Sequence, residues 1–456
     1  MTELSRLPIV GGPVPWLIDA FGLAALVWLA WGSRRYVTRW LPAAAVASLL
    51  LAGLVWFFSE RVWNLWGAPQ PKRVYLFAAL GFLAVLLMVP KMIQSRRLAA
   101  KIVAFPAAAL LIVTSASLLN LTFEYYPTFG SLFGDTGVKV ETLQQFRASH
   151  GGGADMQPAA TTLASWQPPS DMPAEGQMLQ VAIPAPTSHE VSSSAYVYLP
   201  PAYLGSRRAN LPVLVLIHGV PGGTLDWPRG GMIAQFMNHY AQAHNGLTPI
   251  VVMPDAGGRW AKYPPLCLNS GQGQAATYLA HDIPDWVKKT FGAGTLSARQ
   301  WAIGGFSYGG TCAMQLAVNY PGVYPTFIDS SGENEPLISQ GHDVLLRQYF
   351  GGSQARFEQQ NALNVLKTRR FPHSAGIVTV GRADSFYRPQ GIQVFDAMKR
   401  AGMDVAIQDA PGGHAWPAWK YGMENNMDWL LSRLGVLPSP TQPPAPPGNA
   451  VDTASP

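Results

Sequence analysis

The hydrophobic residues of this chain follow two patterns, one before residue 120 and another after residue 176. The first part contains four apolar runs, at residues 16–32, 41–58, 74–90 and 102–119, whose only charged residue is Asp19. Each run reaches the roughly 17 to 25 residues that a helix needs to cross a bilayer, and none shows the polar face of a buried soluble helix. Because three further runs follow the first, a cleavable signal peptide does not explain the pattern. We therefore predict a membrane domain with four transmembrane helices at residues 1–121.

Basic residues in the short loops predict the orientation of this domain, because lysine and arginine favour the cytoplasmic side. The loops after the first and third runs carry seven of them: Arg34, Arg35, Arg39, Lys91, Arg96, Arg97 and Lys101. The opposite side carries four: Arg6, Arg61, Lys72 and Arg73. Both ends of the membrane domain, and the chain that follows it, are expected on the extracytoplasmic side of the cell membrane.

After residue 176, short apolar runs alternate with helical segments. The expected strands are residues 177–183, 195–199, 213–217, 249–253, 301–304, 326–329, 377–380 and 404–408, of which the first two form an antiparallel pair. Such alternation predicts an α/β domain, with a mostly parallel sheet and helices on both of its faces. We place this domain at residues 177–437.

Two segments show neither pattern. Residues 122–176 include glycines at 151 to 153 and prolines at 168 and 169, which is typical of a linker. Residues 438–456 are rich in proline, serine and alanine, which predicts a disordered tail. The linker would lie outside the cytoplasm, between the membrane domain and the α/β domain.

Composition excludes several classes of function. Charged residues make up 13% of the chain, about half of the usual fraction in a soluble protein. The formal net charge of +6 comes largely from the membrane loops, so it does not indicate nucleic-acid binding. The sequence contains no P-loop, no dinucleotide fingerprint and no metal-ligand cluster. We therefore expect no cofactor and no metal ion.

Residues 305–309 read G-x-S-x-G between an expected strand and an expected helix. A strand that turns sharply into a helix lifts the central side chain clear of the sheet, and it needs small residues two positions to either side. Gly305 and Gly309 occupy those positions around Ser307. We predict that Ser307 is a nucleophile and that its helix begins near Gly310 and Thr311.

A serine nucleophile requires a histidine base and a carboxylate that orients the base. His414 follows the last expected strand in a loop with two preceding glycines, and Asp384 follows the strand before it. These residues are the expected base and acid. Other acids in similar loops remain alternatives to Asp384, namely Asp409, Asp329 and Glu333. The weaker alternatives to the base are His218, His281, His342 and His373.

Backbone N–H groups must also stabilise the oxyanion that forms during acyl transfer. The first expected donor is Tyr308, directly after the nucleophile. The second should lie in the loop after residues 213–217, where Pro221 has no N–H group, so we assign it to Val220. His218 in the same loop is expected to have a structural role. The segment between Gly332 and Pro372 is expected to form helices over the site and to supply the acyl pocket.

Residues from about 177 to 434 resemble the esterase D group of α/β-hydrolases, which includes carboxylesterases, S-formylglutathione hydrolases, siderophore esterases and mycolyltransferases. The matching pieces are His218-Gly219, Gly222-Gly223, Asp226-Trp227, Tyr278-Leu279, Asp282-Ile283-Pro284, residues 305–310, Gly381, Asp384, residues 412–416 and Trp419. The resemblance implies an α/β-hydrolase fold. It also places the catalytic triad of the family on Ser307, Asp384 and His414.

The two cysteines of the chain could approach each other in this arrangement. Cys312 lies in the expected helix after the nucleophile, and Cys267 lies in a loop after a neighbouring strand. An exported domain is exposed to an oxidising compartment. We predict a disulfide, with two buried thiols as the alternative.

Together these features predict a membrane-anchored serine esterase that acts through an acyl-enzyme on a lipid or an envelope-linked ester. An acyltransferase similar to the mycolyltransferases would use the same triad, so it remains an alternative. The alternative from another class is a hydrolase-like binding or scaffold module without catalysis. A complete triad in the order Ser, Asp, His argues against that alternative. The partners expected from the sequence are the membrane and the ester substrate.

Overall fold

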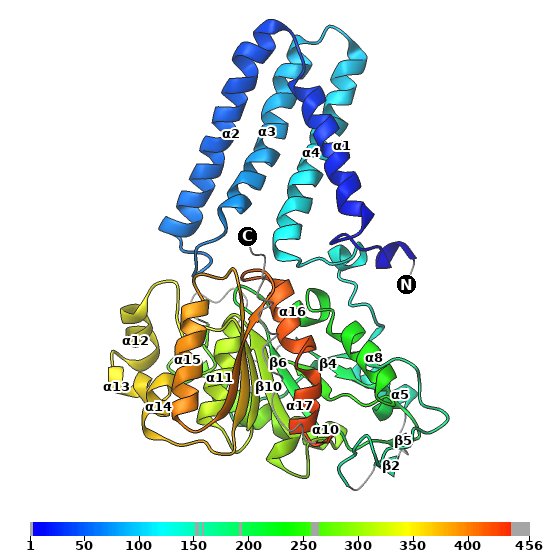
Figure 1. Cartoon of the computed structure of the whole chain (residues 1–456), viewed down its shortest axis with the longest axis vertical. Coiled ribbons are helices and arrows are strands. Elements are labelled where there is room, and N and C mark those ends of the chain that lie inside the picture. Colours follow the sequence, from blue (N-terminus) through cyan, green and yellow to red (C-terminus); the bar gives the residue numbers. More distant parts are fainter. Residues whose placement is uncertain (1–2, 151–154, 157–158, 191–193, 257–263, 439–456) are drawn as a thin grey trace, which may run out of the picture. The chain divides into compact units, whose positions relative to one another are not determined.

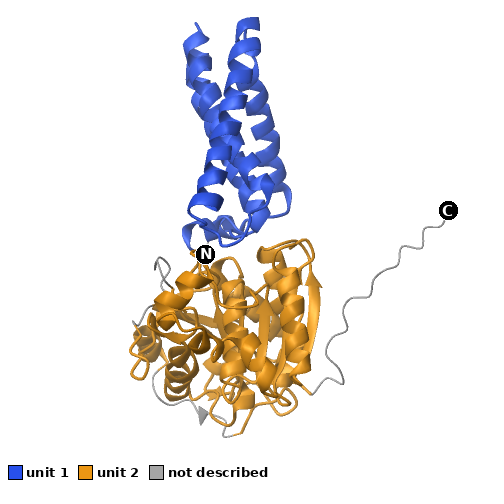
Figure 2. Cartoon of the chain, turned by 90° about the vertical axis from the view of Figure 1, so that its left-hand side faces the viewer, with its two compact units in different colours: residues 1–135 blue, residues 136–456 orange. Residues whose placement is uncertain are grey.

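The computed structural model describes residues 3–150, 155–156, 159–190, 194–256 and 264–438. The predicted tail lies outside the described residues, apart from its first residue. The chain forms two compact units, residues 1–135 and residues 136–456 (Figure 2). Each unit is described by itself below.

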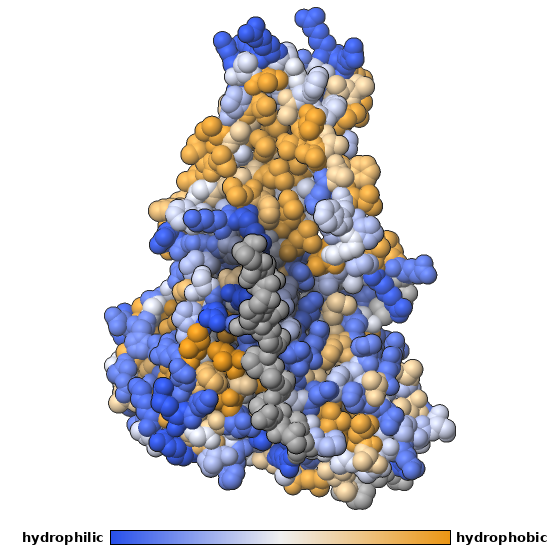
Figure 3. Space-filling view, in the orientation of Figure 1, coloured by the Kyte–Doolittle hydropathy of each residue, from blue (hydrophilic) through white to orange (hydrophobic). Residues whose placement is uncertain are grey.

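Unit 1 consists of four long helices, α1 (Pro13–Ala30), α2 (Leu41–Trp56), α3 (Lys72–Gln94) and α4 (Leu98–Phe123) (Figure 1). Short π-helical turns, Tyr36–Trp40 and Phe57–Val62, extend α2 at its two ends. All four helices are long and apolar enough to cross a membrane. Hydrophobic side chains gather over the helices of this unit on the face shown in Figure 3. The four apolar runs of the sequence therefore form four helices of membrane-spanning length.

Small residues and hydrogen bonds join these helices. A Cβ atom at Gly22 of α1 would lie 2.0 Å from the Thr114 hydroxyl of α4, so the two helices approach closely at this glycine. The Thr114 hydroxyl lies 3.2 Å from the carbonyl oxygen of Ile18, and Ser115 donates to the carbonyl oxygen of Phe77 at 2.6 Å. Such contacts are typical of helix association in membranes, where burial of apolar surface gives little driving force.

Unit 2 is built on a nine-stranded sheet with the order β1-β3-β4-β7-β6-β10-β11-β12-β13. In that order the strands are Val140–Thr142, Gln177–Ala182, Ser194–Leu199, Ile250–Met253, Val213–Ile217, Trp301–Phe306, Thr326–Ser330, Ala375–Gly381 and Asp404–Ala410. Only β4 runs antiparallel to its neighbours; all other pairs are parallel. Every residue of β6, β10 and β11 is buried, as expected for strands covered on both faces. The mostly parallel sheet expected from the sequence is confirmed.

Helices of unit 2 cover this sheet (Figure 1). The longer ones are α5 (Leu143–Ser149), α8 (Ile233–Ala243), α10 (Ile283–Phe291), α11 (Tyr308–Asn319), α12 (His342–Phe350), α14 (Ala362–Thr368), α15 (Arg388–Arg400), α16 (Trp416–Glu424) and α17 (Met427–Arg433). Shorter turns are α6 (Pro201–Leu204), α7 (Asp226–Arg229), α9 (Ala275–Thr277) and α13 (Gln354–Glu358). Two small two-stranded ladders pair β2 (Asp155–Met156) with β5 (Arg207–Arg208) and β8 (Asn269–Ser270) with β9 (Gly273–Gln274). Helix α11 packs on β6, β10 and β11, while α16 packs on β11, β12 and β13.

The structure corrects the boundaries predicted for the linker. Helix α4 continues to Phe123, and unit 2 begins at Thr136. Residues 140–142 of the predicted linker form β1, which pairs with Met178, Leu179 and Gln180 of β3. Within the same segment, Trp166 is buried and donates its indole N–H to the carbonyl oxygen of Asn245. Most of the predicted linker therefore belongs to the α/β unit.

Candidate active site

The predicted nucleophile lies at the turn between β10 and α11. Ser307 has a φ of 53° and a ψ of −127°, a backbone conformation that is strained for a residue with a side chain. A Cβ atom at Gly305 would lie 2.3 Å from the backbone of Gly309, and one at Gly309 would lie 2.2 Å from the carbonyl oxygen of Ile217. Both glycines are therefore required by close backbone contacts. Helix α11 begins at Tyr308, two residues earlier than predicted.

His414 connects Ser307 to Asp384. Its Nε2 atom lies 2.9 Å from Ser307 Oγ, and its Nδ1 atom lies 3.0 Å from Asp384 Oδ2. The Asp384 side chain is buried, and its second oxygen accepts the N–H groups of Phe386 and Tyr387 at 3.3 and 2.9 Å. These backbone bonds fix the carboxylate against the histidine. The structure thus brings the three residues assigned from sequence into one hydrogen-bonded series.

The other carboxylates considered for the acid lie elsewhere. Asp409 makes a two-pronged ion pair with Arg388, at 3.0 and 3.1 Å. Asp329 lies at the end of β11, where it accepts the N–H of Gly332 at 2.8 Å. Glu333 contacts Thr311 in the first turn of α11. In the structure, Asp384 is the carboxylate that contacts His414.

Aromatic residues that sequence reasoning did not assign to the site hold the base in place. The ring of Tyr387 stacks on the imidazole of His414, with 3.9 Å between centroids and 13° between planes. The ring of Trp419 meets the imidazole edge-on at 5.1 Å and stacks on Phe306 at 4.3 Å. Trp419 carried a signal, as part of the family resemblance. Tyr387 follows Asp384 by only three residues, but nothing in the sequence shows that its ring turns toward the histidine.

The loop after β6 carries the second predicted oxyanion donor. Val220 precedes a cis peptide bond to Pro221 and is 38% exposed, whereas Tyr308 is the buried first residue of α11. The first N–H groups of a helix have no partner within the helix, so the Tyr308 amide can serve an oxyanion. Tyr308 directly follows Ser307, and the loop of Val220 follows β6, which pairs with β10. The roles of both residues as donors stay predictions.

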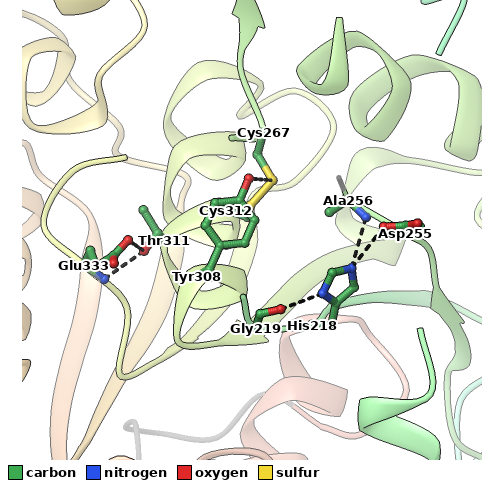
Figure 4. The surroundings of a disulfide bond; sticks show 9 residues. All are labelled: His218, Gly219, Asp255, Ala256, Cys267, Tyr308, Thr311, Cys312 and Glu333. Carbon is green, nitrogen blue, oxygen red and sulfur yellow. Dashed lines mark hydrogen bonds and ion pairs between the residues drawn. A yellow bond between two sulfur atoms is a disulfide. The ribbon is translucent and has the colours of Figure 1, made fainter. Parts of the chain in front are cut away.

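His218 stabilises the start of this loop. The residue is buried, and its ring nitrogens lie 2.7 Å from the carbonyl oxygen of Gly219 and 3.3 Å from Asp255 (Figure 4). Burial opposes protonation, but the hydrogen bonds to Asp255 and Gly219 outweigh it, so the pKa of His218 is raised. His218 contacts loop backbone, which agrees with the structural role expected for it. Among the described residues, no group of His, Cys, Asp and Glu side chains could hold a metal ion.

The structure joins Cys267 and Cys312 in a disulfide beside Tyr308, the residue that follows the nucleophile (Figure 4). Both residues are 1% exposed. The hydroxyl of Tyr308 donates to Cys267 Sγ at 3.4 Å. The disulfide therefore ties α11, which carries the predicted oxyanion donor Tyr308, to the loop that precedes β8.

Replacing both cysteines with serine is expected to destabilise unit 2 by about 2 to 4 kcal/mol, because the bond closes a loop between residues 45 positions apart. The measurement is thermal unfolding of the full-length protein in detergent, with and without reductant. Reductant should lower the melting temperature of the wild type and leave that of the double variant unchanged. Two free thiols in mass spectra of protein purified without reductant would contradict the disulfide.

Comparison with known proteins identifies a family. A family model described as "Putative esterase" matches residues 188–429, which is more than half of the chain. An acetyl esterase of Caldicellulosiruptor saccharolyticus is 22% identical over 237 residues, which cover 48% of this chain and 84% of that protein. An uncharacterized protein of Corynebacterium glutamicum is 29% identical over 439 residues, which cover 92% of this chain and 98% of the relative. The latter alignment is too long to lie within unit 2 alone.

Solved structures with similar folds include an esterase and a hydrolase. A ferulic acid esterase has a TM-score of 0.48 and 17% sequence identity, and the match covers 58% of this chain and 100% of the esterase chain. The S-formylglutathione hydrolase from Agrobacterium tumefaciens also has a TM-score of 0.48, with 19% sequence identity, and the match covers 58% of this chain and 97% of the hydrolase chain.

Proposed function

Because this chain belongs to the "Putative esterase" family, we propose that it is a membrane-anchored serine esterase that cleaves a carboxylic ester of a lipid or of another cell-envelope component. The observation that carries the proposal is the hydrogen-bonded series from Asp384 through His414 to Ser307, with distances of 3.0 and 2.9 Å. Ser307 is 9% exposed, and it lies at the turn that presents a nucleophile in hydrolases of this type.

In the proposed reaction, His414 Nε2 takes the proton of Ser307 as Oγ bonds to the ester carbonyl carbon. The carbonyl oxygen becomes an oxyanion, which the N–H groups of Tyr308 and Val220 would stabilise. Collapse of this intermediate breaks the bond to the alcohol oxygen, which receives the proton from His414. Water then attacks the acyl-enzyme by the same steps and releases the acid. Asp384 holds the imidazole in the required tautomer and stabilises the imidazolium.

Acyl transfer to an alcohol remains the alternative, because it differs from hydrolysis only in the nucleophile that attacks the acyl-enzyme. Products formed from one ester, with and without an added acceptor alcohol, would distinguish the two activities. Release of free acid at an unchanged rate in the presence of the alcohol supports the esterase. A binding or scaffold module without catalysis would give neither product.

The side of the membrane on which the enzyme acts decides which esters it can reach. The basic residues of the helix-connecting loops favour an extracytoplasmic unit 2, where esters at the level of the lipid headgroups are accessible. Protease added to intact spheroplasts is therefore expected to degrade or release unit 2, while a cytoplasmic marker protein stays protected. If unit 2 were degraded only after the membrane had been permeabilised, the orientation and the proposed envelope substrate would both be withdrawn.

A further inference from the structure

Unit 1 contains an apolar groove that plays no part in the proposed reaction. The groove has a volume of about 660 Å³ and is bordered by α1 and α4, which lie side by side (Figure 1). Its lining within these helices includes Val14, Ile18, Val113, Ala116, Leu119 and Phe123. The lining side chains are hydrophobic apart from Ser117, Asn120 and two tyrosines. Burial of an apolar ligand against such a surface is favourable.

Hydrogen bonds between chain segments keep the groove in shape. The segment before α1 and the segment after α4 form its remaining wall. They are joined by the N–H of Ile9, which donates to the carbonyl oxygen of Pro127 at 3.0 Å. In the last turn of α4, the Asn120 side chain donates to the carbonyl oxygen of Tyr126 at 2.8 Å and accepts the N–H of the same residue at 2.9 Å. Because these bonds are made within the protein, the wall does not depend on a bound ligand.

The length of the groove corresponds to one leaflet of a bilayer. A Cβ atom at Gly22 would lie 2.0 Å from the Thr114 hydroxyl, so α1 and α4 touch directly next to Val113 and the groove ends there. From Val113 to Phe123 the helix rises by about 15 Å, which is half of the hydrocarbon core of roughly 30 Å. Val113 is 49% exposed and Ala116 is also exposed. The groove is therefore open on the side that lipid would reach.

We propose that this groove binds one acyl chain of a membrane lipid. Its length matches one leaflet, and Tyr125 and Tyr126 line the end beyond α4. Tyrosine combines an apolar ring with a polar hydroxyl, which suits the level of the lipid headgroups. Water is a poor occupant, because apolar cavities stay dry. A transmembrane helix of a second copy would be about twice as long as the groove. The site requires that unit 1 spans a membrane, and it does not depend on the esterase activity.

The test uses the full-length protein in phosphatidylcholine vesicles that contain a phosphatidylcholine with a photoreactive diazirine in one acyl chain. After irradiation, mass spectrometry locates the attached lipid and measures its amount per chain. We expect the label to concentrate on peptides from residues 4–18 and 113–132. Its yield there should level off at one lipid per chain as the fraction of probe in the vesicles rises, because the groove holds a single acyl chain.

A larger side chain in the groove should displace the lipid. In Ala116→Trp we expect at least fivefold less label on these peptides than in the wild type. The matched control is Ala109→Trp, two turns earlier on α4, where the alanine is exposed but does not line the groove. Seven residues return a helix to nearly the same face, so both variants place tryptophan on the same side of α4. Labelling of the control should stay within twofold of the wild type.

Unchanged labelling in Ala116→Trp would overturn the inference. If that variant does not fold, the wild type alone decides: label on residues 113–132 must exceed label around Leu50, a 65% exposed residue of α2, at least fivefold. A stable dimer in mild detergent that Ala116→Trp dissociates would show that a second copy fills the groove, and would also refute the lipid site. If no helix of unit 1 were labelled, its placement in the membrane would be contradicted together with the inference.

Discussion

Replacing Ser307 with alanine is expected to lower kcat/KM for short p-nitrophenyl esters by about 10⁶-fold, because loss of a triad nucleophile can reduce the catalytic rate by about this factor. The side chain is short, and its Oγ atom contacts His414 at 2.9 Å, so its removal should not disturb the fold. The measurement is ester hydrolysis by purified protein, with thermal unfolding as the check that the variant is folded.

A buried serine away from the site provides the matched control. Ser432 on α17 is 5% exposed and donates to the carbonyl oxygen of Asp428 at 2.8 Å. The Ser432→Ala variant should keep its hydrolysis rate within a few-fold of the wild type. If the Ser307→Ala variant retained activity within tenfold of the wild type, Ser307 would not be the nucleophile.

Replacing Asp384 with asparagine is expected to reduce kcat by about 10⁴-fold, because the amide no longer holds the imidazole in the tautomer that accepts the serine proton. His414→Ala should cost more, since that change removes the base itself. Asp409→Asn is the control: Asp409 is 41% exposed and its partner is Arg388, so hydrolysis should change less than threefold. Equal rates for Asp384→Asn and the wild type would redirect the assignment to Asp409 or Glu333.

The features that the sequence predicted depend on local patterns. Each of the four apolar runs is long and apolar enough to span a membrane. A single segment in such an environment satisfies its own backbone hydrogen bonds only as a helix. Ser307, Asp384 and His414 each follow a strand of a parallel sheet, and the ends of such strands meet at one edge. Assigning the three strands was therefore enough to predict that the three side chains lie near one another.

The features that the sequence did not predict depend on contacts between distant segments. Strand β1 has three residues, and its pairing with β3 bridges positions 140–142 and 178–180, so its own composition gave no strand signal. Tyr387 belongs to the site because its ring stacks on the imidazole of His414, and the sequence does not show the orientation of that ring. Glu333 was considered only as an acid for the triad, because its contact with Thr311 of α11 joins residues 22 positions apart in the sequence.

The reactivity of Ser307 as a nucleophile can be measured by mass spectrometry after reaction with a fluorophosphonate probe. The probe forms a stable bond to an activated serine and needs no knowledge of the natural ester. We expect one adduct per chain, located on the peptide that contains Ser307, absent from the Ser307→Ala variant and strongly reduced in His414→Ala. A folded wild-type protein that forms no adduct, or one labelled at another residue, would contradict this role of Ser307.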